Sequence, residues 1–158
     1  MEQTYVDIMI QSLNKKIQVL DKIIEKNQLQ KEILENPEGT VDEFDQVVED
    51  KSALIEQLEQ LDSGFDKLYD RVKEALKTDK EAYVDKIAQM QDAIRKITEK
   101  SMDIQTQESR NKDLMMQKVA FVKNTAKKLR TNKKAVSQYY QTMMQLNYVD
   151  PQFLDNKK

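Results

Sequence analysis

The chain lacks cysteine, histidine and tryptophan, and it contains only two glycines and two prolines among its 158 residues. Without cysteine it can form neither disulfides nor thiolate metal sites, which fits a reducing compartment. Without histidine it also lacks an imidazole base, a zinc triad and the Glu-x-x-His pairs of di-iron bundles. Two isolated glycines cannot build a phosphate-binding loop. We therefore interpret the chain as a binding protein without a cofactor or metal, rather than as an enzyme.

The sequence also shows no targeting or membrane segment. Residues 1–16 lack a basic leader followed by an uninterrupted apolar run, so no signal peptide is predicted. No apolar stretch approaches the roughly 20 residues that cross a bilayer. We expect a cytoplasmic protein with no direct membrane insertion.

Turn-forming residues are so scarce that the fold must consist of few, long elements. Apolar residues recur at alternating steps of three and four, the spacing of one stripe along a helix that packs against other helices. Only Lys51 interrupts the longest stripe. Its residues are Phe44, Val47, Leu54, Leu58, Leu61, Phe65, Leu68, Val72 and Ala75. With 39% hydrophobic residues, the chain predicts an all-α, elongated antiparallel helical bundle of three long helices plus a short C-terminal helix or tail.

The first two helices are predicted to form an antiparallel hairpin. A helix over about 3–35 should stop at the Asn-Pro-Glu-Gly sequence of residues 36–39, because proline disfavours helix at the preceding residue. Thr40 and Glu43 then have the spacing of a capping box, which begins a second helix over 41–77. So short a connection makes the two helices neighbours.

The third helix is predicted over 79–129, after a turn for which Thr78 and Glu81 offer a second capping box. The alternative is one continuous rod that pairs with another chain, as a homodimer. Residues 105–113 contain no apolar side chain, so they form either a hinge or a polar part of one helix. The apolar register resumes at Met115, which favours continuity.

The charges are unevenly distributed. Residues 1–78 hold 10 basic and 18 acidic residues, a net charge of −8, and residues 79–158 hold 16 and 10, a net charge of +6. Within 110–134, nine basic residues face the single Asp113. This pattern favours an acidic hairpin packed against a basic helix. It argues against a nucleic-acid partner, since the overall balance is acidic and few aromatic residues lie among the lysines.

The bundle is expected to occupy residues 1–129, and residues 130–158 differ from it in character. This C-terminal segment holds three of the six tyrosines, and Pro151 prevents helix near its end. It forms either a short fourth helix that closes the bundle or a docking segment rich in aromatic and methionine side chains.

The stretch KSALIEQLEQLDSGFDKLYDRV (51–72) resembles the central helix of FlgN-type flagellar export chaperones. The long helix before it, the acidic first half, the basic third helix and the apolar tail also fit. The residues that carry the resemblance are Lys51, Leu54, Ile55, Leu58, Leu61, Asp62 and Phe65. The resemblance implies a small cytosolic type III secretion chaperone that binds hook-associated (hook–filament junction) proteins. It would shield their terminal helices and deliver them to the export-gate membrane protein.

The resemblance directs attention to two candidate surfaces. The apolar residues at the end of the third helix are predicted to bind the client helix, because they lie beyond the reach of the hairpin; core packing against the tail is the alternative. They are Met115, Val119, Val122, Ala126 and Leu129. The family implies that a tyrosine near the C-terminus docks on the export gate, and Tyr140 is our choice. The wider patch comprises Tyr139, Tyr140, Met143, Met144, Tyr148, Phe153 and Leu154.

A second function remains compatible with these patterns. A coiled-coil scaffold or tether that acts only by self-association would have the same apolar stripes. An extended dimer with no vacant groove would favour that alternative.

Overall fold

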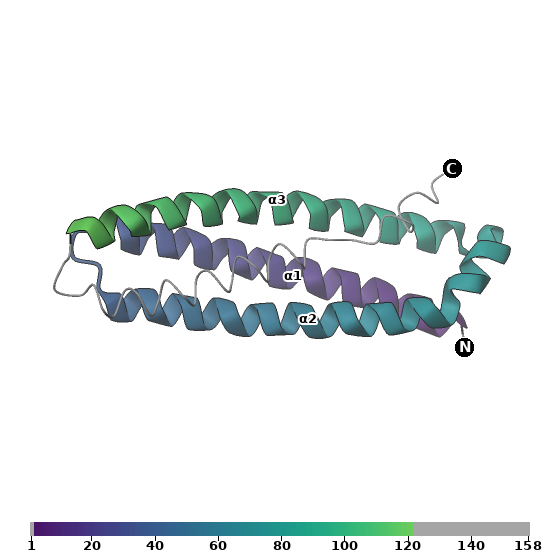
Figure 1. Cartoon of the computed structure of the whole chain (residues 1–158). Coiled ribbons are helices and arrows are strands. Elements are labelled where there is room, and N and C mark those ends of the chain that lie inside the picture. Colours follow the sequence, from purple (N-terminus) through teal and green to yellow (C-terminus); the bar gives the residue numbers. More distant parts are fainter. Residues whose placement is uncertain (1, 122–158) are drawn as a thin grey trace.

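Three long helices lie side by side along most of the described chain (Figure 1). The structure is a computed structural model that describes residues 2–121. Helix α1 spans Glu2–Glu35, α2 spans Val41–Thr78, the short 3-10 helix η1 spans Lys80–Tyr83, and α3 spans Val84–Phe121. The prediction of an all-α bundle with three long helices is confirmed, and no strand occurs within the described residues. None of these helices is long and apolar enough to cross a membrane.

The connection between α1 and α2 forms as its sequence predicts. The Thr40 hydroxyl accepts a hydrogen bond from the backbone N–H of Glu43 at 3.1 Å, and the Glu43 carboxylate accepts from the backbone N–H of Thr40 at 3.2 Å. This is the complete capping box, and it satisfies backbone donors at the start of α2. A Cβ atom at Gly39 would overlap the carbonyl oxygen of Ile33, so only glycine fits this close approach.

The second connection differs from the prediction. The expected capping box of Thr78 and Glu81 does not form, because the Thr78 hydroxyl instead donates to the carbonyl of Glu74 at 2.8 Å. The chain turns through η1, where the backbone N–H of Ala82 donates to the carbonyl of Asp79 at 3.2 Å. The third α-helix therefore begins at Val84 rather than at residue 79.

Helix α1 is the central element of the described bundle. It packs against both α2 and α3, whereas the α2 and α3 backbones seldom approach each other within the described residues (Figure 1). The larger hydrophobic cluster, which we call the main core, contains side chains from all three helices. They include Val6, Met9, Leu13, Leu20, Ile23, Leu54, Ile55, Leu58, Val72, Leu76, Tyr83, Met90, Ile94, Ile97 and Ile104. Full burial of one such aliphatic side chain contributes about 1.5–3 kcal/mol.

A second, smaller cluster lies at the end of the bundle that holds the α1–α2 connection. We call it the end cluster, and it comprises Ile33, Phe44, Val47, Val48 and Met115. It unites the end of α1, the start of α2 and the last turns of α3. The end cluster is separate from the main core, and polar side chains account for the separation.

Candidate functional site: a buried polar layer and the bundle end

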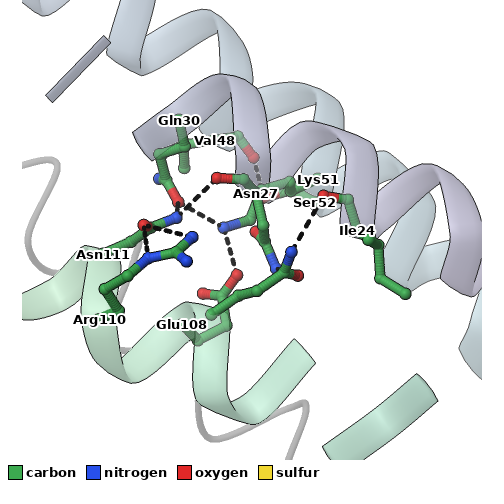
Figure 2. A network of polar contacts seen from close by, with 10 residues as sticks. Ile24, Asn27, Gln30, Val48, Lys51, Ser52, Glu108, Arg110 and Asn111 are labelled. Carbon is green, nitrogen blue, oxygen red and sulfur yellow. Dashed lines mark hydrogen bonds and ion pairs between the residues drawn. The ribbon is translucent and has the colours of Figure 1, made fainter. Parts of the chain in front are cut away.

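Lys51, which interrupts the apolar stripe of α2, is fully buried. Its Nζ atom lies 2.6 Å from Oε1 of Glu108 on α3, and the two side chains are only 2% and 1% exposed. The same ammonium group donates to Oε1 of Gln30 on α1 at 3.0 Å (Figure 2). One lysine thus joins all three helices at a single level of the bundle.

Amide side chains complete this level. Asn111 Nδ2 donates to the backbone carbonyl of Asn27 at 2.9 Å and to Oε1 of Gln30 at 3.1 Å (Figure 2). Asn27 Nδ2 donates to Oε1 of Gln107 at 3.1 Å. We refer to the buried polar residues Asn27, Gln30, Lys51, Glu108 and Asn111 as the polar layer.

The polar layer explains the polar stretch 105–113, which continues as part of helix α3. Glu108 and Asn111 project into the bundle, whereas their neighbours Ser109 and Lys112 are exposed. The stretch is therefore a helix whose inner face is polar, and the hinge does not form.

Sequence reasoning missed the polar layer, although its signals are visible. Lys51 breaks one apolar stripe, and residues 105–113 break another. Asn27 and Gln30 continue the apolar register of α1 with polar residues. Each of the three helices thus has one break in its apolar stripe. Placing these breaks at the same level of an antiparallel bundle would have predicted a polar layer there.

Burial lowers the pKa of Lys51 below its ordinary value, because a charged ammonium is costly to remove from water. The negative charge of Glu108 and its hydrogen bond act in the opposite direction. The ion pair with Glu108 therefore stabilises the charged form of Lys51 against the cost of burial.

The end cluster lies between the polar layer and the α1–α2 connection. Met115 is its contribution from α3, and this side chain is 1% exposed. One turn later, Lys118 Nζ donates to three backbone carbonyls of the hairpin: Ile33 at 3.4 Å, Asn36 at 3.2 Å and Gly39 at 3.2 Å. A cation that binds carbonyls near the end of α1 is electrostatically favourable there.

The described residues contain no group of three or more acidic, histidine or cysteine side chains that could hold a metal ion. The polar layer and the end cluster consist of helix packing, hydrogen bonds and one buried ion pair.

The family model described as FlgN protein matches residues 1–147 of the chain. The chain belongs to the FlgN family. FlgN proteins are flagellar export chaperones, and they bind flagellar hook-associated proteins. Comparison with curated proteins and with solved structures gives no match. The resemblance inferred from residues 51–72 is thereby confirmed.

The structure of this FlgN protein places one of the predicted client-binding residues. Met115 is buried in the end cluster, so the expectation that it lies beyond the reach of the hairpin is wrong: α3 still contacts the hairpin at Lys118. Val119 belongs to the last turn of α3. The other predicted residues lie outside the described part of the chain: Val122, Ala126, Leu129, Tyr139, Tyr140, Met143, Met144, Tyr148, Phe153 and Leu154.

Proposed function

We propose that this FlgN protein is a cytoplasmic chaperone of flagellar type III secretion. It binds hook-associated proteins before their export, shields their amphipathic terminal helices, and delivers them to the export-gate membrane protein. The family match over residues 1–147 carries this proposal, because it extends through all three helices and into the segment that follows them.

The client helix is proposed to bind the apolar residues of the predicted stripe that follow Met115, which are Val119, Val122, Ala126 and Leu129. Their spacing of three and four residues is that of a helical stripe, the form in which one amphipathic helix recognises another. The continuity of helix α3 to Phe121 supports the proposal, because the stripe begins within a helix.

Partly exposed apolar residues of α2 support helix binding as well. Leu61, Phe65 and Leu68 contact the main core and yet are only half-buried. A bundle with such a partly covered apolar face is suited to accept another helix.

A triple substitution tests the client surface. We expect Val122→Asp, Ala126→Asp and Leu129→Asp together to weaken binding of a purified hook-associated protein by at least about tenfold, because each carboxylate would be desolvated in the interface. Met102→Asp is the matched control, since Met102 also lies on α3 and is 62% exposed. Calorimetry measures both affinities. Equal affinity of the triple variant and the control would remove these residues from the client surface.

The docking role of the C-terminal segment needs a separate test. We expect a variant with Tyr139→Ala and Tyr140→Ala to bind the hook-associated protein normally and to lose binding to the cytoplasmic part of the export gate. Variants that keep this binding would contradict the docking role.

Light scattering of the free protein tests whether it forms a homodimer. A stable dimer that binds no hook-associated protein would favour the coiled-coil scaffold or tether over the chaperone.

A further inference from the structure

A groove lies between α1 and α2 near the middle of both helices. It has a volume of about 410 Å³, and each of the two helices supplies one apolar residue to it, Val19 and Leu61. Its complete lining is Lys15, Gln18, Val19, Lys22, Gln57, Gln60 and Leu61. The groove thus combines a small apolar contact area with amide and ammonium groups.

The charge of the groove is opposite to that of the hairpin that forms it. Residues 1–78 carry a net charge of −8, whereas the charged residues of the lining are Lys15 and Lys22. Both lysines are exposed. A local positive charge on an acidic hairpin favours a partner that brings carboxylates to this place.

Two exposed apolar residues of α1 lie in line with these lysines. Ile8 and Leu29 are each 41% exposed, although both are large apolar side chains. The four residues are spaced by seven, and we call them the heptad line: Ile8, Lys15, Lys22 and Leu29. Seven residues are nearly two helical turns, so these side chains follow one another along one side of α1. At a rise of 1.5 Å per residue, the heptad line is about 30 Å long.

We propose that the heptad line and the adjoining groove bind an acidic amphipathic helix of another protein. That helix carries apolar, acidic, acidic and apolar residues at intervals of seven. The surface uses residues of α1 and α2, whereas the proposed client-binding residues follow Met115 in the sequence. The proposal therefore goes beyond the chaperone function and adds a second binding surface.

The contacts of the bound helix follow from this spacing. Helices that wind around each other meet again every seven residues, because the winding compensates for the drift of a straight helix. Apolar residues near the two ends of the bound helix pack on Ile8 and Leu29. Its two carboxylates lie against the lysines, and an apolar residue between them enters the groove at Val19 and Leu61.

Charge disfavours the two occupants that this chain could supply itself. The heptad line reads the same in both directions, so two copies of α1 in contact along it would place lysine against lysine in either orientation. Like charges in contact are unfavourable. Residues 130–158 hold five basic and two acidic residues, so the C-terminal segment has the same sign of charge as the groove. A separate acidic partner is the better fit.

A pair of synthetic peptides tests this recognition on the full-length protein. The acidic peptide, of about 28 residues, carries leucine, glutamate, glutamate and leucine at intervals of seven, with one further leucine between the glutamates. Alanine and glutamine, which are good helix formers, occupy its other positions. The basic peptide has lysine in place of both glutamates. Because the heptad line reads the same in both directions, either orientation of the peptide can bind.

Calorimetry compares the affinities of the two peptides for the wild type. We expect the acidic peptide to bind at least about tenfold more tightly, because the basic peptide replaces two ion pairs by two like-charge contacts. The preference should decrease as the salt concentration rises, since the lysines are exposed. Equal affinities, or no measurable binding of the acidic peptide, overturn the proposal.

Charge reversal distinguishes recognition by the groove from attraction by net charge. Lys15→Glu with Lys22→Glu should invert the preference, so that the basic peptide binds more tightly than the acidic one. Lys77→Glu with Lys80→Glu is the matched control, because it changes the net charge equally at two other exposed lysines. Charges beyond a Debye length are screened, so this control should keep both affinities within about twofold of the wild type. A control that inverts the preference as well overturns the proposal.

The apolar ends of the heptad line give a second readout. Ile8→Gln with Leu29→Gln should weaken binding of the acidic peptide about three- to tenfold, because less apolar surface is buried in the complex. Met102→Gln is its control, since Met102 is 62% exposed on α3 and should leave the affinity unchanged. An unchanged affinity of the Ile8 and Leu29 variant contradicts the heptad line as the binding surface.

The outcome is separable from that of the chaperone function. Neither peptide contains a sequence of a hook-associated protein, so their binding is decided whether or not such a protein binds. Helical circular dichroism checks that each variant folds. Should the charge-reversed variant fail to fold, the two peptides on the wild type and the Ile8 and Leu29 variant decide the proposal.

Discussion

Lys51 and Glu108 depend on each other. Each carries a charge into a site that water does not reach, and their 2.6 Å contact is the main compensation for that cost. Residue hydropathy alone would place neither of them inside the protein. Their burial is understood only when α2 and α3 are seen together.

Removing one partner should be far more harmful than removing both. We expect Glu108→Met to lower the free energy of unfolding by about 3–5 kcal/mol, because Lys51 would remain buried without its counter-charge. The double change, Lys51→Met with Glu108→Met, should leave stability unchanged or raise it. Urea unfolding followed by circular dichroism measures both. A single variant as stable as the double variant would contradict the account of the ion pair.

The lowered pKa of Lys51 makes stability depend on alkaline pH. Since the folded-state pKa lies below the unfolded value, the unfolded chain binds more protons between the two values, and stability rises with pH across that interval. Unfolding of the wild type and of the double variant should be compared between about pH 8 and pH 11. We expect the wild type to gain stability relative to the double variant over this range.

NMR titration of the lysine side chain provides a direct check. Glu108→Gln should lower the pKa of Lys51 further, because the charge of Glu108 opposes the effect of burial. An unchanged or higher value in this variant would show that Glu108 does not stabilise the charged lysine.

At the scale of elements, the helix starts differ although their sequences look alike. Thr40 and Thr78 are each followed by glutamate three residues later, but only Thr40 caps a helix. The residues before Thr40 include proline and glycine, which enforce a break. No such residue precedes Thr78, so α2 continues to Thr78 and the turn becomes a 3-10 helix. A capping pattern predicts a helix start only where the chain must already leave the preceding helix.

The two threonines offer a matched comparison. We expect Thr40→Ala to reduce the free energy of unfolding by about 0.5–2 kcal/mol, because it removes the side-chain oxygen that caps α2. Thr78→Ala should change it by no more than about 0.5 kcal/mol, since Thr78 is exposed and caps no helix start. Equal losses in thermal or urea unfolding would contradict the assignment of the cap.

The two glycines should respond in opposite ways to alanine. No atom lies within 4 Å of a Cβ built at Gly64, so Gly64→Ala should stabilise the interior of α2 by about 1 kcal/mol. Gly39→Ala should destabilise the hairpin, because the new Cβ would overlap the Ile33 carbonyl. Urea midpoints compare both variants with the wild type. A loss of stability in Gly64→Ala would point to a close contact at this position.

The elements were largely predictable because the helical period and the Pro-Gly connection are local signals. The apolar register that resumes at Met115 favoured a continuous helix through residues 105–113. The structure explains this continuity, because Glu108 and Asn111 are buried on the inner face of α3. The position of Met115 was not predictable in the same way. Whether α3 ends beside the hairpin or beyond it depends on the turn at η1, which local patterns do not determine.

At the scale of the whole molecule, charge complements the packing. Lys86 and Lys100 of α3 each lie 2.6 Å from an aspartate of α1, Asp7 and Asp21 respectively. These pairs join α3 to α1 of the acidic hairpin. They are partly exposed, so each contributes little and is screened by salt. Their main effect is to favour the observed order of helices.

The central claim is that this FlgN protein binds an amphipathic helix of a hook-associated protein through the end of its bundle. Calorimetric titration of the full-length chain with a purified hook-associated protein, intact or lacking its terminal helices, tests it most directly. The account predicts a defined complex with the intact protein and a loss of affinity of at least about tenfold without the terminal helices. Equal binding of the two forms, or no binding of either, would contradict it.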